Sequence, residues 1–323
     1  MKRIALTVGD PNGIGPEIAL KSLAALSPAQ RAQITLFGPE PVLARTAQTL
    51  NLQALLAEVA VVPVGHLPDA AHRPGEVCAE AGHSAVVSAS AAIEACCAGG
   101  FDAVVAGPHH ETAIARAGIA FNGYPGLVAR VSGVPEDAVF LMLVGAGLRI
   151  VHATLHESVE HALQRLTPAL VVAAATAGLR ACTAMGIARP RAALFGINPH
   201  ASEGELFGPH DRRCTRPAAA RLRELGHDVA DPQGADVLLA DRATRPFDLY
   251  VAMLHDQGHI PVKLLAPQGA SALSIGARVL LASTGHGSAM DIAGTGRARP
   301  DAMLRSLQLV GGWSDFSSSH ASP

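Results

Sequence analysis

Three histidines lie where the sequence predicts that strands end, and imidazole is a common ligand for divalent metals. His156 follows the apolar run 150–153, His200 follows 192–197 and His255 follows 249–253. Ligands of open α/β sheets gather beyond the carboxyl ends of the strands. Three neutral imidazoles that met there would hold a metal ion with room for a substrate. The three positions have no diagnostic spacing, so an ordinary structural role for each histidine is the alternative.

A second segment, 285–296, reads Gly-His-Gly-Ser-Ala-Met-Asp-Ile-Ala-Gly-Thr-Gly. It resembles the adenosine-binding loop of the isocitrate and isopropylmalate dehydrogenases, which bind the dinucleotide without a Rossmann unit. The resemblance implies that His286 contacts adenine, that Gly287 and Ser288 line the loop, and that Asp291 accepts hydrogen bonds from the ribose hydroxyls. Because a carboxylate at Asp291 would repel a 2′-phosphate, NAD is expected over NADP. A tight glycine-rich turn is the alternative for the later half.

The third segment, 9–17, reads Gly-Asp-Pro-Asn-Gly-Ile-Gly-Pro-Glu after a predicted strand. Pro16 suits the first turn of a helix, and a helix start of this kind can bind an anion. A third glycine at the Rossmann spacing is missing, and the chain has no P-loop motif. Taken alone, this segment is best interpreted as a structural turn between strand and helix.

Short β-rich runs alternate with alanine-rich stretches, which predicts a mainly parallel sheet covered by helices. The predicted helices are 88–99, 168–186 and 216–226. The predicted strands are 4–8, 34–37, 103–106, 139–144, 150–153, 192–197, 249–253 and 279–283. The serine-rich end, 313–323, is expected to be a loose tail.

The composition and charge argue against nucleic-acid binding and against a membrane span. The formal net charge is −2 and no basic patch with interleaved aromatics occurs, so nucleic acid is not an expected partner. The most apolar stretch, 170–184, is interrupted by Arg180 and is expected to be a buried helix, with no membrane span. Five cysteines without a CxxC pair indicate reduced residues in a cytoplasmic protein.

Nearly the whole chain, residues 4–309, resembles the 4-hydroxythreonine-4-phosphate dehydrogenase family. The resemblance rests on segments 9–17, 107–119, 198–204 and 255–263. It implies an α/β fold like that of isocitrate and isopropylmalate dehydrogenase, with two three-layer α/β/α domains and the active site in the cleft between them. Residues 1–130 with 270–312 would form the dinucleotide-binding domain. Residues 131–269 would form the domain for metal, substrate and dimerisation.

The same resemblance assigns roles. It implies a homodimer with the active site at the interface, where His156, His200 and His255 from both subunits bind a divalent metal. Zinc is the first expectation, with cobalt, manganese and magnesium open. Asp236 and Lys263 fall close to the substrate, and they are the first and second candidates for the catalytic base.

Departures from the family motifs point to a different substrate. Tyr124 replaces part of a substrate-holding His-Thr pair, and Glu111 replaces a lysine. Ala272 and Leu281 stand where the family has asparagine and arginine. These changes forfeit charge-assisted contacts to a phosphate. Segments 108–114, 140–150, 155–159 and 253–260 instead resemble a subgroup, the terephthalate cis-dihydrodiol dehydrogenases.

This subgroup resemblance implies oxidation and decarboxylation of terephthalate cis-dihydrodiol to protocatechuate, CO2 and NADH. Tyr124, Lys263 and Arg278 are the expected substrate contacts, and Arg149, Arg278 or His259 could face the second carboxylate. The alternatives are a 4-hydroxythreonine-4-phosphate dehydrogenase and, less favoured, a phosphate acetyltransferase-like enzyme without metal. A non-catalytic binding protein ranks below both.

Overall fold

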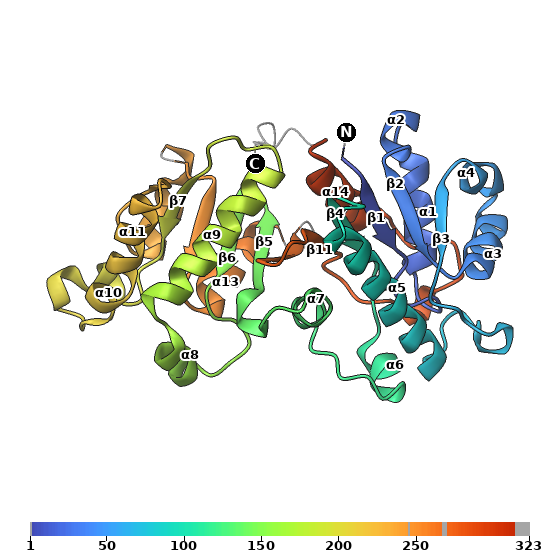
Figure 1. Cartoon of the computed structure of the whole chain (residues 1–323), viewed down its shortest axis with the longest axis horizontal. Coiled ribbons are helices and arrows are strands. Elements are labelled where there is room, and N and C mark those ends of the chain that lie inside the picture. The colour runs from blue at the N-terminus through green and yellow to red at the C-terminus, as the bar shows by residue number, and fades with distance from the viewer. Residues whose placement is uncertain (1, 245, 267–269, 314–323) are drawn as a thin grey trace. The chain divides into compact units, whose positions relative to one another are not determined.

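The chain forms two compact units, each a sheet with helices, in a computed structural model that describes residues 2–244, 246–266 and 270–313 (Figure 1). The first unit contains Met1–Glu136 and Ala277–Ser314, and the second contains Asp137–Gly276. The predicted α/β class is therefore confirmed for both units. The predicted loose tail lies, beyond Trp313, outside the described residues.

The sheet of the first unit is parallel throughout. Its strands stand in the order β3-β2-β1-β4-β11. The central strands β1 and β4 are buried at every position, as expected for parallel strands that are covered on both sides, whereas the edge strand β3 is largely exposed. The strands are β1 (Ile4–Thr7), β2 (Ile34–Gly38), β3 (Ala60–Pro63), β4 (Ala103–Ala106) and β11 (Leu281–Ser283).

Helices cover this sheet. Helix α5 packs on β1, β2 and β4, while α14 packs on β1, β4 and β11 and also contacts α1. The α-helices are α1 (Gly15–Ala25), α2 (Pro28–Arg31), α3 (Glu40–Leu50), α4 (Gln53–Ala57), α5 (Ala79–Cys97), α6 (Glu111–Arg116), α7 (Tyr124–Ser132) and α14 (Asp301–Gly311). Short 3-10 turns are η1 (Asp69–Ala71), η2 (Glu136–Ala138) and η5 (Met290–Ile292).

The sheet of the second unit is mixed, with the order β10-β5-β6-β9-β7-β8. Pairs β6–β9, β9–β7 and β7–β8 are parallel, whereas β5 pairs with β6 and with β10 in antiparallel fashion. Ala146 and Gly147, both with positive φ, join β5 to β6, and such a two-residue link can only form a hairpin. The strands are β5 (Phe140–Gly145), β6 (Leu148–His152), β7 (Arg191–Leu194), β8 (Asp228–Val229), β9 (Leu249–Ala252) and β10 (Ser271–Ile275).

Alternation along β6 separates the two faces of this sheet. Ile150 packs with Val262 of α13, whereas Val151 lies against Gly178 of α9. Helices α9 and α13 therefore cover opposite faces. The helices are α8 (Val159–Arg165), α9 (Pro168–Ala184), α10 (His210–Arg213), α11 (Thr215–Glu224), α12 (Ala235–Ala240), α13 (His255–Leu265) and the 3-10 turns η3 (Pro199–Glu205) and η4 (Asp241–Ala243).

The eight strands and three helices predicted from sequence are all present, with ends shifted by a few residues except for α5, which begins earlier at Ala79. Strands β3, β8 and β10 were not predicted because each is short or carries no clear alternation of apolar and polar residues.

The five cysteines are free thiols. In the described part of the chain no single helix is long and apolar enough to cross a membrane. Only helices α8 and α9 taken together, with a bend of 94° between them, have the length and composition of a membrane span.

Candidate functional site

The three predicted metal-ligand histidines follow three neighbouring parallel strands of the second unit. His156 comes after β6, His255 after β9 and His200 after β7, and β9 lies between the other two strands. Their carboxyl ends therefore meet at one edge of the sheet, as the sequence predicted.

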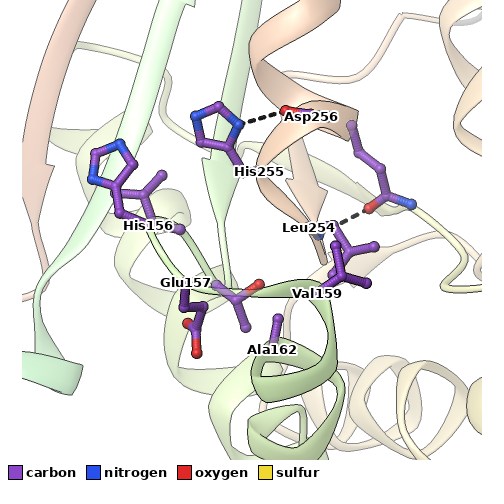
Figure 2. A pocket seen from close by; sticks show the side chains of 10 residues that line it. His156, Glu157, Val159, Ala162, Leu254, His255 and Asp256 are labelled. Atoms are coloured by element: carbon purple, nitrogen blue, oxygen red, sulfur yellow. Dashed lines mark hydrogen bonds and ion pairs between the residues drawn. The ribbon is translucent and has the colours of Figure 1, made fainter.

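His156 and His255 line a common pocket of about 410 Å³, together with Thr154, Glu157 and Asp256 (Figure 2). The two imidazole ring centres are 5.6 Å apart. Nδ1 of His255 lies 2.6 Å from Oδ1 of Asp256, so the carboxylate engages that nitrogen and leaves Nε2 for another partner. Because a carboxylate on the far nitrogen orients a ligating histidine, this arrangement suits a metal ligand.

Two further histidines extend this group. His259 stacks on His255 with ring centres 3.7 Å apart, and its Nδ1 lies 3.0 Å from Nε2 of His152. His152 is buried, and its Nδ1 lies 3.2 Å from the carbonyl oxygen of Leu141. Burial lowers the pKa of His152 to about 3 and that of His259 to about 4, with neighbouring imidazoles adding to both shifts. Both rings are therefore neutral at pH 7.

His200 lies in a turn whose backbone conformation is unusual. Residues His200 to Gly204 all have positive φ, a left-handed conformation that costs about 1–2 kcal/mol per non-glycine residue. The buried carboxylate of Asp211 holds the turn, because it accepts the backbone N–H of Ile197 (2.8 Å) and Asn198 (3.1 Å) and the hydroxyl of Ser202 (2.7 Å). These bonds keep His200 at the edge of the sheet.

Gln257 ties the helix that carries His255 to the segment that leads to His200. Its side-chain oxygen accepts the backbone N–H groups of Met253 and Leu254, and its Nε2 donates to the carbonyl of Gly196. Asp236 reaches the same neighbourhood. A side chain on Gly234 would meet the Asp236 carboxylate at 2.5 Å and the backbone nitrogen of His200 at 3.8 Å.

Imidazole and carboxylate side chains of this kind are ligands that divalent metals accept. Within residues 2–244, 246–266 and 270–313, no three His, Cys, Asp or Glu side chains are arranged to hold an ion. His156 and His255 share the pocket, but His200, Asp236 and Lys263 are not among its lining residues. Lys263 lies on the same face of α13 as His255 and His259, because successive members are four residues apart.

In the first unit, three sequence segments follow the carboxyl ends of neighbouring strands β1, β4 and β11. Asp10 donates its backbone N–H to the carbonyl of Pro108 (2.9 Å), and Ile14 donates to the carbonyl of Ser288 (2.9 Å). A side chain at Gly9, whose φ is +71°, would meet the Pro108 carbonyl oxygen at 2.2 Å, so glycine is required there. The segments 9–17 and 285–296, which are far apart in the sequence, are therefore joined by a backbone hydrogen bond.

The expected adenosine-binding residues differ in exposure. His286, Gly287 and Asp291 are exposed, while Ser288 is buried against Gly13. A side chain at Gly287 would meet nothing within 4 Å, so the loop has open space on that side. The Asp291 carboxylate is thus accessible to a ligand, and the role of this segment as a dinucleotide-binding loop stays a prediction. A small pocket of about 100 Å³ lies nearby, lined among others by Gly13 and Gly294.

Three predicted substrate contacts have definite positions. Tyr124 is buried, its hydroxyl donates to the carbonyl of Gly107 at 2.6 Å, and burial raises its pKa. Arg278 is exposed. Arg149 is buried, and it donates to the carbonyl of Asp248, the residue before β9. That position is the opposite edge of the sheet from the histidines, so Arg149 is removed from the groups that could face a carboxylate there.

Sequence reasoning missed several residues that shape these sites. His152, Asp211, Gln257 and Glu17 act through hydrogen bonds to partners that are distant in the sequence. The sequence feature that could have identified them is their position, because they are polar residues in or beside predicted apolar strands or at the starts of helices. Only their partners, which the fold supplies, distinguish them from solvated side chains.

Comparison with known proteins agrees with the motifs. The sequence profile of the family described as pyridoxal phosphate biosynthetic protein PdxA matches residues 14–310. A 1,2-dihydroxy-3,5-cyclohexadiene-1,4-dicarboxylate dehydrogenase from Comamonas sp is 58% identical over 96% of this chain and 97% of its own.

Two crystal structures are also similar. One is a terephthalate 1,2-cis-dihydrodiol dehydrogenase from Burkholderia xenovorans LB400, with 48% identity and a TM-score of 0.79 over 97% of this chain and 98% of the other. The second is a 4-hydroxythreonine-4-phosphate dehydrogenase from Burkholderia phymatum, with 33% identity and a TM-score of 0.85 over the same shares of the two chains. The extent of the profile and these identities over almost the whole chain show that this protein belongs to the PdxA family of dehydrogenases.

Proposed function

We propose that this chain oxidises terephthalate cis-dihydrodiol with NAD and decarboxylates the product, giving protocatechuate, CO2 and NADH in a metal-dependent reaction. The observation that carries the proposal is the 58% identity, over 96% of the chain, with a dehydrogenase named for this dihydroxy-cyclohexadiene dicarboxylate. The histidine-lined edge of the second unit supports it, because a substrate with adjacent hydroxyl and carboxylate oxygens suits a metal bound by imidazoles.

The reaction needs a base, a hydride acceptor and charge stabilisation. The base removes the proton of the secondary hydroxyl while the hydride of the same carbon passes to C4 of the nicotinamide. The resulting ketone is β to a carboxylate. Loss of CO2 leaves its electron pair on the ring, and the aromatic catechol forms. His156, His200 and His255 would hold the divalent ion, zinc by preference, which when bound acts as a Lewis acid that stabilises negative charge on the substrate oxygens.

Residues of this chain supply the remaining roles. Asp236, whose carboxylate lies against Gly234 close to the segment of His200, is the first candidate base. Lys263, on the face of α13 that carries His255, is the second candidate and a substrate contact. Arg278 is exposed and His259 lies beside His255, so these two remain the candidates for the distal carboxylate. Tyr124 is proposed as an apolar wall, since its hydroxyl already donates to Gly107.

NAD is the proposed hydride acceptor. The exposed carboxylate of Asp291 would accept hydrogen bonds from the ribose, with His286 against adenine and the backbone of Gly287 and Ser288 forming the loop. The first unit is the proposed dinucleotide-binding domain, and we propose that the fold is related to that of isocitrate dehydrogenase.

A homodimer is part of the proposal. One chain's described residues do not bring three metal ligands together. Two large apolar side chains of α13, Ile260 (61% exposed) and Leu264 (77%), stand beside the His255–Lys263 face. Covering them with a second copy would remove apolar surface from water. Light scattering tests the dimer. Mixing inactive His156→Ala with inactive His200→Ala tests shared sites, because one site of the mixed dimer would then combine an intact His156–His255 pocket with an intact His200: regained activity supports ligands from two subunits.

The decisive experiment compares two substrates. Purified protein is given NAD with terephthalate cis-dihydrodiol or with 4-hydroxythreonine 4-phosphate, and NADH is followed by absorbance, with and without EDTA and with Zn2+ restored. We expect NADH and protocatechuate only from the dihydrodiol, lost with EDTA and regained with metal. Turnover of the phosphorylated amino acid alone would overturn the substrate assignment, and full activity in EDTA would overturn the metal dependence.

A further inference from the structure

Two large apolar side chains follow turn η3 and stand in solvent. Leu206 is 73% exposed and Phe207 is 43% exposed, and we refer to these two residues as the η3 tip. Their backbone N–H groups donate to the carbonyls of Glu203 and Ser202, each across 3.3 Å. The backbone of the tip is therefore held in one conformation before any contact is made. Exposed apolar side chains on a fixed backbone are typical of a protein–protein contact, because binding then costs little conformational entropy.

The η3 tip is coupled to His200. The ring centre of Phe207 lies 6.0 Å from that of His200, with the ring planes inclined by 40°. Ser202, whose carbonyl accepts the N–H of Phe207, also donates its hydroxyl to the buried Asp211 carboxylate that holds the turn. A surface that receives the tip therefore also receives the imidazole of His200.

The pocket beside His156 and His255 offers a matching apolar surface. In Figure 2, Val159, Ala162 and Leu254 lie together next to the two imidazoles. Val159 is 61% exposed although it lines this pocket of about 410 Å³. An apolar side chain that entered the pocket would remove from water both its own surface and that of Val159.

The tip of the same chain does not fill this pocket. Neither Leu206 nor Phe207 is among the residues that line it, and both remain exposed. His200 is likewise not among the lining residues of the pocket that His156 and His255 share. Tip and pocket are thus an apolar projection and an apolar recess on one unit, and neither is covered by the other. A second copy of this chain supplies the partner that each of them lacks.

Symmetry makes the exchange reciprocal. The tip follows β7 and the pocket follows β6 and β9, so both lie at the carboxyl edge of one sheet. A two-fold axis at that edge can seat each tip in the pocket of the other copy and close the assembly at two chains. Helix α13 starts at the pocket with His255 and extends this surface with the exposed Ile260 and Leu264. The contact is therefore continuous with the face proposed above for the dimer.

Charge contributes less than the apolar contact. Arg213, at the end of α10 after the tip, and Glu160, beside Val159 on α8, are both exposed and opposite in sign. Glu203 is an exposed carboxylate close to the tip and offsets part of this attraction. Because exposed ion pairs stabilise little, the Phe207 ring is the expected source of most of the affinity.

We propose that the η3 tip of one copy inserts beside Val159 and Leu254 of a second copy, and that this insertion brings His200 to the second copy's His156 and His255. The inference rests on the proposed homodimeric enzyme, and it names the side chains that join the two halves of the site. Phe207 is the anchor, and Val159 is its main contact.

Photo-crosslinking tests the contact directly. The photoreactive analogue p-benzoylphenylalanine is placed at position 207 of the full-length chain, and the irradiated protein is resolved by denaturing gel and peptide mass spectrometry. We expect a band of twice the chain mass, with the crosslink in residues 154–162 or 254–257. The matched control carries the analogue at Leu225, which is 48% exposed after α11, and we expect no crosslink to those residues. A crosslink from position 207 confined to its own chain, or to any other surface of the second copy, would overturn the proposal.

A charged side chain in the tip should weaken the dimer. Phe207→Asp would bring a carboxylate into an apolar recess, so we expect the dimer dissociation constant to rise at least about tenfold. Phe207→Leu keeps an apolar anchor, and we expect it to stay within about threefold of the wild type, as should the control Leu225→Asp. Sedimentation velocity over a dilution series measures the four proteins, and circular dichroism verifies their folds. A wild type that is monomeric at every concentration, or a folded Phe207→Asp that dimerises as tightly as the wild type, would contradict the anchor.

These measurements use neither substrate nor metal, so they separate the interface from the reaction. The expected crosslink together with no NADH from either substrate would leave the interface standing and overturn the proposed function. NADH from the dihydrodiol together with a crosslink elsewhere would support the function and overturn this inference.

Discussion

The carboxylate of Glu17 accepts the backbone N–H of Ala298 at 2.8 Å, a contact between residues 281 positions apart. The same carboxylate accepts from Gly296 and pairs with Lys21 at 2.7 Å, and Lys21 donates in turn to the carbonyls of Gly296 and Ala298. Glu17 is buried. Helix α1 thereby holds the end of the segment proposed to bind adenosine.

Glu17→Gln should loosen that segment. An amide N–H would face backbone donors, and Lys21 would lose its carboxylate partner, so we expect the free energy of unfolding to fall by about 3 kcal/mol and the KM for NAD to rise. Denaturant unfolding and initial rates measure the two effects. The control is Glu94→Gln, an exposed glutamate of α5. Wild-type stability together with wild-type KM would contradict the assigned role.

Asp291→Ala should weaken NAD binding more than catalysis. Losing a charged acceptor of ribose hydroxyls costs about 1.5–3 kcal/mol, so we expect the KM for NAD to rise roughly ten- to a hundredfold with a smaller change in kcat. Preference for NAD over NADP should also fall, because the repulsion of a 2′-phosphate is gone. Steady-state kinetics with both cofactors measure this, with the exposed Asp137→Ala as control. An unchanged KM would remove Asp291 from the cofactor site.

Asp211→Asn should release the left-handed turn that carries His200. An amide nitrogen cannot accept the N–H and O–H groups that now point at the carboxylate. We expect a loss of about 3 kcal/mol of stability and metal binding weakened about tenfold or more. Asp231→Asn, which loses only an exposed ion pair with Arg223, is the control. Titration with Co2+ and denaturant unfolding measure metal affinity and stability in both variants. Equal metal affinity and equal stability of Asp211→Asn and Asp231→Asn would refute the role of Asp211 in holding the turn.

Asp10 should make stability depend on pH. Burial raises its pKa from 3.8 to about 6, in spite of opposing hydrogen bonds from the backbone of Asn12 and Gly13 and the charge of His110. As pH rises from 4 towards 7 the unfolded chain loses this proton first, so the folded state is progressively disfavoured, by about 2 kcal/mol over that interval.

Asp10→Asn removes that titration while keeping the shape. The unfolding free energy of the variant minus that of the wild type should therefore grow by about 2 kcal/mol between pH 4 and pH 7. Denaturant unfolding across this range measures it, with the exposed Asp137→Asn as control. A difference that does not change with pH would show that Asp10 titrates as an ordinary carboxylate.

The amino-acid sequence by itself determined the α/β class, most elements and the local motifs. Apolar runs of strand length and alanine-rich helices with defined ends are local properties, so they predicted β1, β4, β9 and α9 closely. The histidines after β6, β7 and β9 were identifiable for the same reason, since strand ends can be located without knowing strand order.

Tertiary structure decided what those residues contact. Strand order placed β9 between β6 and β7, which brought the segments of His156, His200 and His255 to one edge. The partnerships of His152 with His259, Asp211 with the left-handed turn and Glu17 with Ala298 each join segments that are separate in the sequence. Hydrogen bonds depend on distance and direction in space, and burial depends on all neighbours together, so neither could be derived from the spacing of residues along the chain.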